Sequence, residues 1–170
     1  MTEGYELYGA EPSYYSGKVR AYLRFKRIPF AEYPNTPENY RKVVVPRVGW
    51  AVIPVMVTPE GETLQDSTDI IDALELRFPE APVYPSTVKQ RLAALLLEVY
   101  GDEWLKIPAM HYRWNRNYDF AISEFGKMSA PELNGEAQRE AGLRISKPFA
   151  GALPFLGVTP KTEAAIETSY

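Results

Sequence analysis

Apolar positions in the first half of the chain change period several times, and each change marks a predicted element. Short apolar runs bounded by glycine or proline predict strands, whereas apolar residues three and four positions apart predict amphipathic helices. On this basis the chain predicts strands over residues 5–9, 28–33, 52–58 and 62–65 and helices over 13–27 and 66–78. The glycine-containing turn between the last two strands predicts an antiparallel hairpin.

The segment between the second and third strands gives a mixed signal. Pro37 suits the first turn of a helix, whereas Val43, Val44 and Val45 favour a strand. With a helix in this segment, the order of elements up to residue 78 is β-α-β-α-β-β-α. The sequence therefore predicts an α/β fold for the first half of the chain.

The second half of the chain lacks a strand-like pattern. A proline-rich stretch over 78–85 ends the first region, and apolar residues at helical spacing follow over 86–107. Another helix is predicted over 132–147. Tyr100 and Trp104 are expected in the core of this helical region.

The last segment has a well-formed helix start. Thr159 suits the N-cap, Pro160 suits the first helical position, and Glu163 places an acid in the first turn. A helix that stops at Tyr170 is marginal in water by itself. We therefore divide the chain into an α/β domain over 1–80, a linker over 81–85 and an all-α domain over 86–170 that we expect to be incomplete.

Composition narrows the class of protein. Of 170 residues, 45% are hydrophobic and 24% charged, as expected for a soluble globular protein with a substantial core. The net charge of −3 provides no basic field for nucleic acid or an anionic membrane, so neither is expected as a partner. The absence of cysteine excludes disulfides, thiolate metal sites and cysteine nucleophiles, and we predict no metal site. Without a signal-peptide pattern or an apolar run of about 18 residues, a cytoplasmic location is expected.

Two short motifs suggest a ligand site. A proline cannot donate to a sheet ladder, so Pro54 at a strand entry is favoured if the Ile53-Pro54 bond is cis. That geometry would leave the backbone N–H and C=O of Ile53 free to pair with a peptide-like ligand. Asp66 and Ser67 open a helix, where anions are favoured, although the same residues also suit a plain N-cap. The two motifs together predict a peptide-binding site.

These motifs carry a family resemblance. Leu7-Tyr8-Gly9, the run Ser13–Arg20, Ile53-Pro54 and Gln65-Asp66-Ser67 resemble, in order and spacing, the N-terminal domain of glutathione S-transferases. The proline-rich linker and the helix after it resemble the entry into that family's all-α domain, and the likeness is looser in the last third of the chain. The resemblance implies a thioredoxin-like α/β domain followed by an all-α domain, with glutathione as co-substrate and a homodimer as the assembly.

The resemblance also implies roles for individual residues. Ser13 falls on the position of the catalytic residue, where its hydroxyl would donate to the thiol of bound glutathione; the other interpretation is that Ser13 only caps the helix. Tyr8 is the rival donor, because some branches of the family use a tyrosine at the end of the first strand. Ser16 stands where a glutaredoxin has its second cysteine, so thiol–disulfide exchange is excluded.

The remaining family roles concern the two ends of glutathione. The backbone of Ile53, next to Pro54, would pair with the cysteinyl part, and Asp66 and Ser67 would hold the γ-glutamyl end.

One departure from the family lies just before this motif. Ala51 and Val52 stand where family members often carry Lys, Gln or His. Arg47 or Lys42 is a candidate replacement that would bind the glycyl carboxylate.

The preferred function is conjugation of glutathione thiolate to a small hydrophobic electrophile. The alternative is a non-catalytic transferase-like module that binds a peptide or protein partner. The aromatic stretch 110–116 lies where transferases build the electrophile pocket, but the single histidine in it, His111, is more typical of a structural residue. The basic set Arg20, Arg24, Lys26 and Arg27 is expected to form a solvated helix face.

Overall fold

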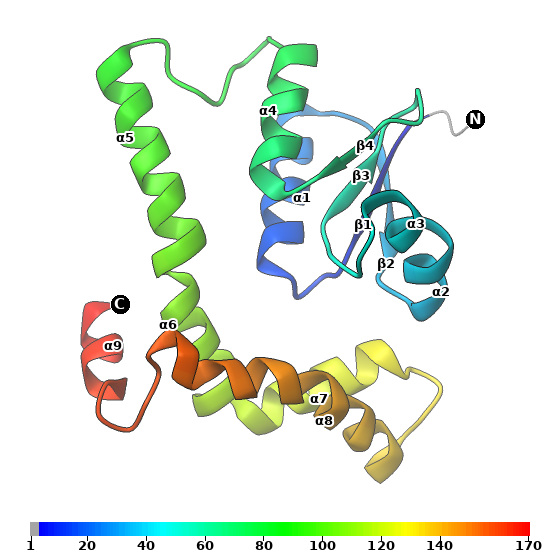
Figure 1. The fold of residues 1–170 in the computed structure, drawn as a ribbon, viewed down its shortest axis with the longest axis vertical. Helices are drawn as coiled ribbons and strands as arrows, with labels where there is room; N and C mark the ends of the chain where they lie inside the picture. The colour runs from blue at the N-terminus through cyan, green and yellow to red at the C-terminus, as the bar shows by residue number, and fades with distance from the viewer. Residues whose placement is uncertain (1–3) are drawn as a thin grey trace. The chain divides into compact units, whose positions relative to one another are not determined.

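The computed structural model describes residues 4–170, which fold into two units divided between Pro85 and Ser86 (Figure 1). The first unit contains a four-stranded sheet with the strand order β2-β1-β3-β4. Its strands are β1 (Tyr5–Gly9), β2 (Phe30–Pro34), β3 (Val55–Val57) and β4 (Thr63–Gln65). β1 pairs in parallel with β2 and antiparallel with β3, and β3 pairs antiparallel with β4, so the predicted hairpin is confirmed.

Helices connect and follow these strands in the predicted order. They are α1 (Tyr14–Lys26), α2 (Pro37–Asn39), the π-helical segment η1 (Tyr40–Val44), α3 (Val45–Val48) and α4 (Ser67–Arg77). The resulting β-α-β-α-β-β-α order confirms the predicted α/β fold, and the helical second half described below confirms the predicted all-α region.

The mixed signal around Val43–Val45 resolves as helix. Val44 is 1% exposed and packs with Tyr8, Val55 and Val57 on one face of the sheet. Burying a valine side chain contributes about 1.5–3 kcal/mol. Valine gives up less than about 0.7 kcal/mol of helix propensity. Packing therefore decides the conformation of this segment.

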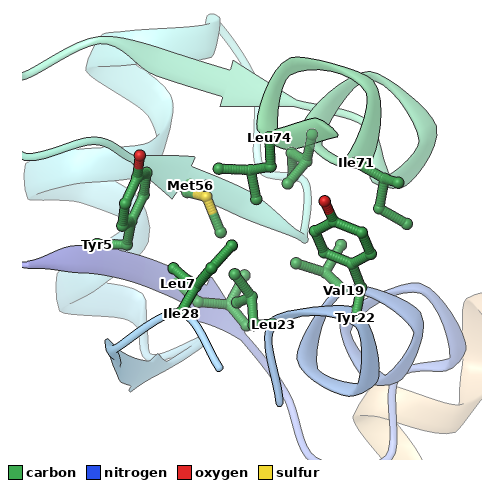
Figure 2. Packing of buried hydrophobic residues seen from close by; sticks show 10 residues of the cluster. Tyr5, Leu7, Val19, Tyr22, Leu23, Ile28, Met56, Ile71 and Leu74 are labelled. Atoms are coloured by element: carbon green, nitrogen blue, oxygen red, sulfur yellow. The ribbon is translucent and has the colours of Figure 1, made fainter. Parts of the chain in front are cut away.

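The other face of the sheet is covered by α1 and α4. Leu7 and Met56 of the sheet pack with Val19 and Leu23 of α1 and with Leu74 of α4, all fully buried (Figure 2). Because side chains alternate along a strand, Leu7 of β1 points toward α1 and α4 while its neighbour Tyr8 points toward the opposite face.

The second unit is helical throughout. Its elements are α5 (Val88–Val99), η2 (Tyr100–Trp104), α6 (Lys106–His111), η3 (Tyr112–Arg116), α7 (Tyr118–Ser129), α8 (Gly135–Ala152), η4 (Leu153–Leu156) and α9 (Glu163–Ser169). η2 and η3 are π-helical and η4 is a 3₁₀ turn. None of the described helices is both long and apolar enough to cross a bilayer.

Two expectations for the second unit are wrong. Tyr100 and Trp104 are 47% and 59% exposed. They lie on η2, which continues α5, and the large apolar side chains of α5 are also exposed. The last helix begins at Glu163 and not at Pro160. Thr159 is instead part of a turn in which its backbone N–H donates to Thr162 Oγ1 at 2.9 Å.

Candidate functional site

Three strand ends lie in one row across the sheet. The register pairs Tyr8 with Val55 and Val55 with Gln65, so the penultimate residue of β1 and the last residue of β4 flank the first residue of β3. Each of these strands leads to or from a predicted site motif. The chain leaves β1 toward Ser13, enters β3 from Ile53-Pro54, and leaves β4 into Asp66-Ser67.

The two helices that follow this row start at the same end of the unit. Near their beginnings, Lys18 Nζ of α1 lies 3.0 Å from Thr68 Oγ1 of α4. Near their ends, Lys26 Nζ lies 2.7 Å from Glu75 Oε1. The helices therefore run side by side in the same direction, as Figure 1 also shows, and the partial positive charge of both N-termini develops at one place.

Ser13 is the N-cap of α1. Its backbone is extended, with φ −76° and ψ 126°, and its Oγ accepts a hydrogen bond from the backbone N–H of Ser16 at 3.2 Å. Capping uses a lone pair of the hydroxyl oxygen and leaves the O–H proton. Within residues 4–170 this is the single hydrogen bond of the Ser13 side chain. The capping and donating roles of Ser13 are therefore compatible.

Ser16, which is completely buried, anchors the loop that leads to Ser13. Its Oγ accepts from the backbone N–H of Ala10 at 3.3 Å. Gly9 is needed at the end of β1, because a Cβ there would lie 2.9 Å from Ser16 Oγ. Ser16 is thus a structural residue of the β1–α1 loop.

Arg20 fixes the same loop from the side. It donates to both carboxylate oxygens of Glu32 on β2, and its Nη2 also donates to the carbonyl of Ala10 at 3.2 Å. Lys26, one of the same basic set, has a side chain that is 1% exposed. The expectation of a solvated basic face is wrong for these two residues, because each has a carboxylate on a neighbouring element within reach.

The Ile53-Pro54 peptide bond is cis, which confirms that prediction. Pro54 is buried directly before β3, and Ile53 is half-buried. Ile53 lies outside the ladder, whose register with β1 begins at the pair Val55–Tyr8.

The start of α4 has an unusual backbone. Asp66 has φ 78° and ψ 137°, and its Oδ1 accepts from the backbone N–H of Thr68 at 2.9 Å. A non-glycine residue in such a region costs on the order of 1–3 kcal/mol and is found most often at functional sites. Ser67 follows at the first helical position and is 3% exposed. Both predicted residues therefore lie at the helix start, with Asp66 as its cap.

The side chain of Tyr8 contacts Tyr33 and Glu6 and not the start of α1. Its ring stacks on Tyr33 with centroids 5.2 Å apart, and its hydroxyl donates to Glu6 Oε2 at 2.9 Å. Burial, helped by the hydrogen bond to Glu6, raises the pKa of Tyr8 to about 12. The Tyr8 side chain belongs to the core cluster that packs against η1, on the face of the sheet opposite α1.

The residues around the departure from the family pattern are also placed. Arg47 Nη1 donates to the carbonyl of Gly61 at 3.2 Å and to Thr63 Oγ1 at 2.9 Å. Lys42 pairs with Glu38 one helical turn away. Both candidate replacements for the missing polar contact are thus hydrogen-bonded within the first unit.

His111 belongs to a network of the second unit. It is completely buried, its Nε2 lies 2.9 Å from Glu167 Oε1, and its Nδ1 lies 3.2 Å from Asn115 Nδ2. Arg116 also donates to Glu167, at 2.6 Å. These contacts fasten α9 to α6 and η3. Among residues 4–170 no cluster of His, Asp and Glu has a geometry suited to a metal ion.

Lys18 is a residue at this site to which the sequence alone assigned no role. Lys18, Tyr22 and Lys26 are four residues apart and form one face of α1. Each of the three contacts α4: Lys18 donates to Thr68, and both Tyr22, at 2.7 Å, and Lys26 donate to Glu75. The spacing of these polar residues was the signal that could have identified them as an interhelical row.

A family model and several solved structures match this chain. Residues 7–82 match the family model described as glutathione S-transferase, N-terminal domain. A glutathione S-transferase from Methylobacterium radiotolerans, solved with glutathione sulfonate, is 29% identical with a TM-score of 0.56. The alignment covers 84% of this chain and 63% of that chain. The search of curated proteins gave no significant match.

Two further solved structures share the fold. A glutathione S-transferase from Methylobacillus flagellatus with glutathione bound is 23% identical, with a TM-score of 0.54 over 85% of this chain and 66% of that chain. A glutathione S-transferase from Rhodospirillum rubrum is 20% identical, with a TM-score of 0.57 over 85% and 62%. The chain therefore spans less than two thirds of the length of these three structures.

Proposed function

Because residues 7–82 belong to the N-terminal domain family of the glutathione S-transferases, we propose that this chain binds glutathione at the row of strand ends and conjugates its thiolate to a small hydrophobic electrophile. The observation that carries the proposal is the register Tyr8–Val55–Gln65. That register gathers Ser13, Ile53 and Ser67 at the end of the unit where α1 and α4 begin.

Each part of glutathione has a partner of suitable chemistry at this place. The backbone N–H and C=O of Ile53 would pair with the cysteinyl residue, as an added strand pairs with a sheet edge. The γ-glutamyl carboxylate would bind to the Ser67 hydroxyl and the first N–H groups of α4, where the helix favours an anion. The carboxylate of Asp66 would face the γ-glutamyl amine.

The chemical step would rest on Ser13. A hydrogen bond from its hydroxyl to the thiolate contributes roughly 1.5–3 kcal/mol, and the start of α1 adds about 0.3–1 kcal/mol. At about 1.4 kcal/mol per pKa unit, these interactions lower the thiol pKa by about one to three units. A thiol with an ordinary pKa of about 8.5 would then be largely ionised at neutral pH and ready to attack an electrophile.

The decisive experiment is titration of the protein with glutathione by calorimetry, followed by a conjugation assay with an aryl halide. Binding together with conjugation supports the proposal, and absence of binding refutes it. Binding without conjugation of any tested electrophile would instead favour the non-catalytic binding module. Ala51 and Val52 are the observation behind that second function, because they provide no polar contact beside Ile53.

The proposal includes a cytoplasmic homodimer as its expected form. Sedimentation equilibrium of the purified chain tests the assembly, and a mass equal to one chain of 19.3 kDa would contradict it.

A further inference from the structure

A lysine of α1 reaches the start of α4. Lys18 Nζ lies 3.0 Å from Thr68 Oγ1, and the backbone N–H of Thr68 donates to Asp66 Oδ1 at 2.9 Å. Lys18, Thr68 and the cap of α4 therefore form one connected group. Because Lys18 lies five residues after Ser13, its ammonium is held within about two helical turns of both helix starts.

The electrostatics of this turn would otherwise oppose an anion. Asp66 caps α4 and Asp69 lies in its first turn. Two carboxylates in the same turn raise the cost of binding an incoming carboxylate there, and the helix terminus offsets only part of that cost. The ammonium of Lys18 supplies a full positive charge at the same turn.

Ser67 is the second part of the subsite. It is 3% exposed, and the structure records no hydrogen bond from its hydroxyl to any other described residue. Since no buried side-chain oxygen or nitrogen among residues 4–170 lacks a partner, this hydroxyl keeps contact with solvent. A hydroxyl that keeps contact with solvent, on the residue before the lysine's partner Thr68, is suited to donate to a carboxylate oxygen.

We propose that Lys18 is a specificity-determining residue, whose ammonium selects ligands that bring a free carboxylate to Ser67 and the first turn of α4. This inference rests on the proposed function, because it takes the γ-glutamyl end of glutathione as the group that binds there. The competing role for Lys18 is a plain brace between α1 and α4 through Thr68. The two roles predict different results when the ligand, and not only the protein, is changed.

The test is a cycle of two ligands and four proteins. The ligands are glutathione and 4-aminobutyryl-cysteinyl-glycine, which differs only in lacking the γ-glutamyl α-carboxylate. The proteins are wild type, Lys18→Gln, Lys18→Arg and Thr68→Val, each checked by circular dichroism and thermal unfolding, with dissociation constants measured by calorimetry. Thr68→Val is the matched control, because it removes the hydrogen bond between Lys18 and Thr68 and keeps the ammonium.

Selection by Lys18 has a definite signature in this cycle. Wild type should bind glutathione at least about tenfold more tightly than the decarboxylated peptide, as expected for a charge-assisted hydrogen bond. Lys18→Gln should reduce that preference about tenfold, whereas Lys18→Arg and Thr68→Val should keep most of it.

Three other outcomes are also decisive. An equal preference for glutathione in wild type and Lys18→Gln would overturn the inference while leaving the proposed function intact. If wild type binds neither peptide, the proposed function fails and this inference fails with it. Should Lys18→Gln not fold, loss of the preference in the folded Thr68→Val protein would still overturn the inference.

Discussion

The ammonium group of Lys26 lies 2.7 Å from the carboxylate of Glu75, and only 1% of the lysine side chain is exposed. The same carboxylate accepts from the hydroxyl of Tyr22 at 2.7 Å and from the backbone N–H of Val83 at 3.0 Å. Lys26 also donates to the carbonyl of Glu80 at 2.7 Å. The pair therefore joins α1 and α4 to the chain that follows α4.

Replacing Glu75 with Gln should destabilise the first unit by about 3 kcal/mol. The substitution leaves the Lys26 ammonium buried without its counter-charge, which costs roughly 3–5 kcal/mol for a fully buried pair, and 11% exposure of Glu75 favours the lower end. Urea unfolding monitored by circular dichroism measures the effect. Glu38→Gln is the control, because the Lys42–Glu38 pair is 62% exposed on both sides and should contribute less than about 1 kcal/mol. Equal destabilisation by the two substitutions would contradict the role given to Glu75.

The same pair predicts a loss of stability in acid. Burial favours the neutral form of Glu75, but hydrogen bonds from Lys26, Tyr22 and Val83 outweigh it and hold the pKa of Glu75 below its ordinary value of 4.5. A carboxyl with a depressed pKa in the folded state stabilises the protein at pH values above the unfolded pKa. That contribution is lost as the pH falls below about 4.5 and through the folded pKa. Glu75→Gln should therefore show a flatter decline of unfolding free energy between neutral pH and pH about 3, and an unchanged slope would refute this.

Two glycines of α8 should respond in opposite ways to alanine. A Cβ on Gly142 would lie 2.1 Å from the carbonyl oxygen of Ile122, a backbone atom of α7 that cannot move without separating the helices. Gly142→Ala should cost at least about 1–3 kcal/mol. A Cβ on Gly151 would meet nothing within 4 Å, so Gly151→Ala should stabilise the helix by about 0.5–1 kcal/mol. Thermal unfolding of the two variants gives the comparison, and a neutral Gly142→Ala would mean that α7 and α8 are not in such close contact.

Much of the first unit could be predicted from local pattern. The period of apolar residues such as Val19 and Leu23 identified α1, and the turn at Gly61 identified the hairpin. These signals are local because a helix or hairpin is defined by spacing within its own segment. The predicted cis bond at Ile53-Pro54 and the helix start at Asp66 rest on equally short motifs.

The errors arose where distant residues decide. An apolar stripe predicts that a helix face will be covered, but the stripe that includes Tyr100 and Trp104 does not specify what covers it. The sequence around Lys26 predicts a surface residue, because the partner that allows its burial, Glu75, lies on another helix. The spacing of Lys18, Tyr22 and Lys26 marks a polar face of α1, but the identity of the partner, Thr68, depends on how α1 and α4 align, which no local pattern encodes.

Ser67→Ala should weaken glutathione binding by about 1–3 kcal/mol, the cost of leaving a charged group of the ligand without a partner. This corresponds to a dissociation constant about 5–150 times larger. Calorimetry on the purified variant measures it, and Ser129→Ala, on the last turn of α7, serves as a control that should leave the affinity unchanged. An unchanged affinity in Ser67→Ala with an intact fold would remove Ser67 from the site.

Ser13→Ala should slow conjugation more than it weakens binding. Loss of the hydroxyl removes a charged hydrogen bond to the thiolate, worth roughly 1.5–3 kcal/mol, so turnover with an aryl halide at neutral pH should fall about 10–100-fold. The dissociation constant of glutathione should change little, because the cysteinyl backbone and the γ-glutamyl end keep their partners. Steady-state kinetics and calorimetry separate the two effects.

The pH dependence distinguishes Ser13 from Tyr8 as the donor. If Ser13 stabilises the thiolate, Ser13→Ala raises the thiol pKa toward its ordinary value of about 8.5 and shifts the pH–rate profile to higher pH. Tyr8→Phe should leave the profile in place, because the Tyr8 hydroxyl donates to Glu6 and its ring lies on the opposite face of the sheet from α1. The reverse result, a shifted profile in Tyr8→Phe and a wild-type profile in Ser13→Ala, would assign the donor role to Tyr8. That outcome would require the Tyr8 hydroxyl to leave Glu6 when glutathione binds.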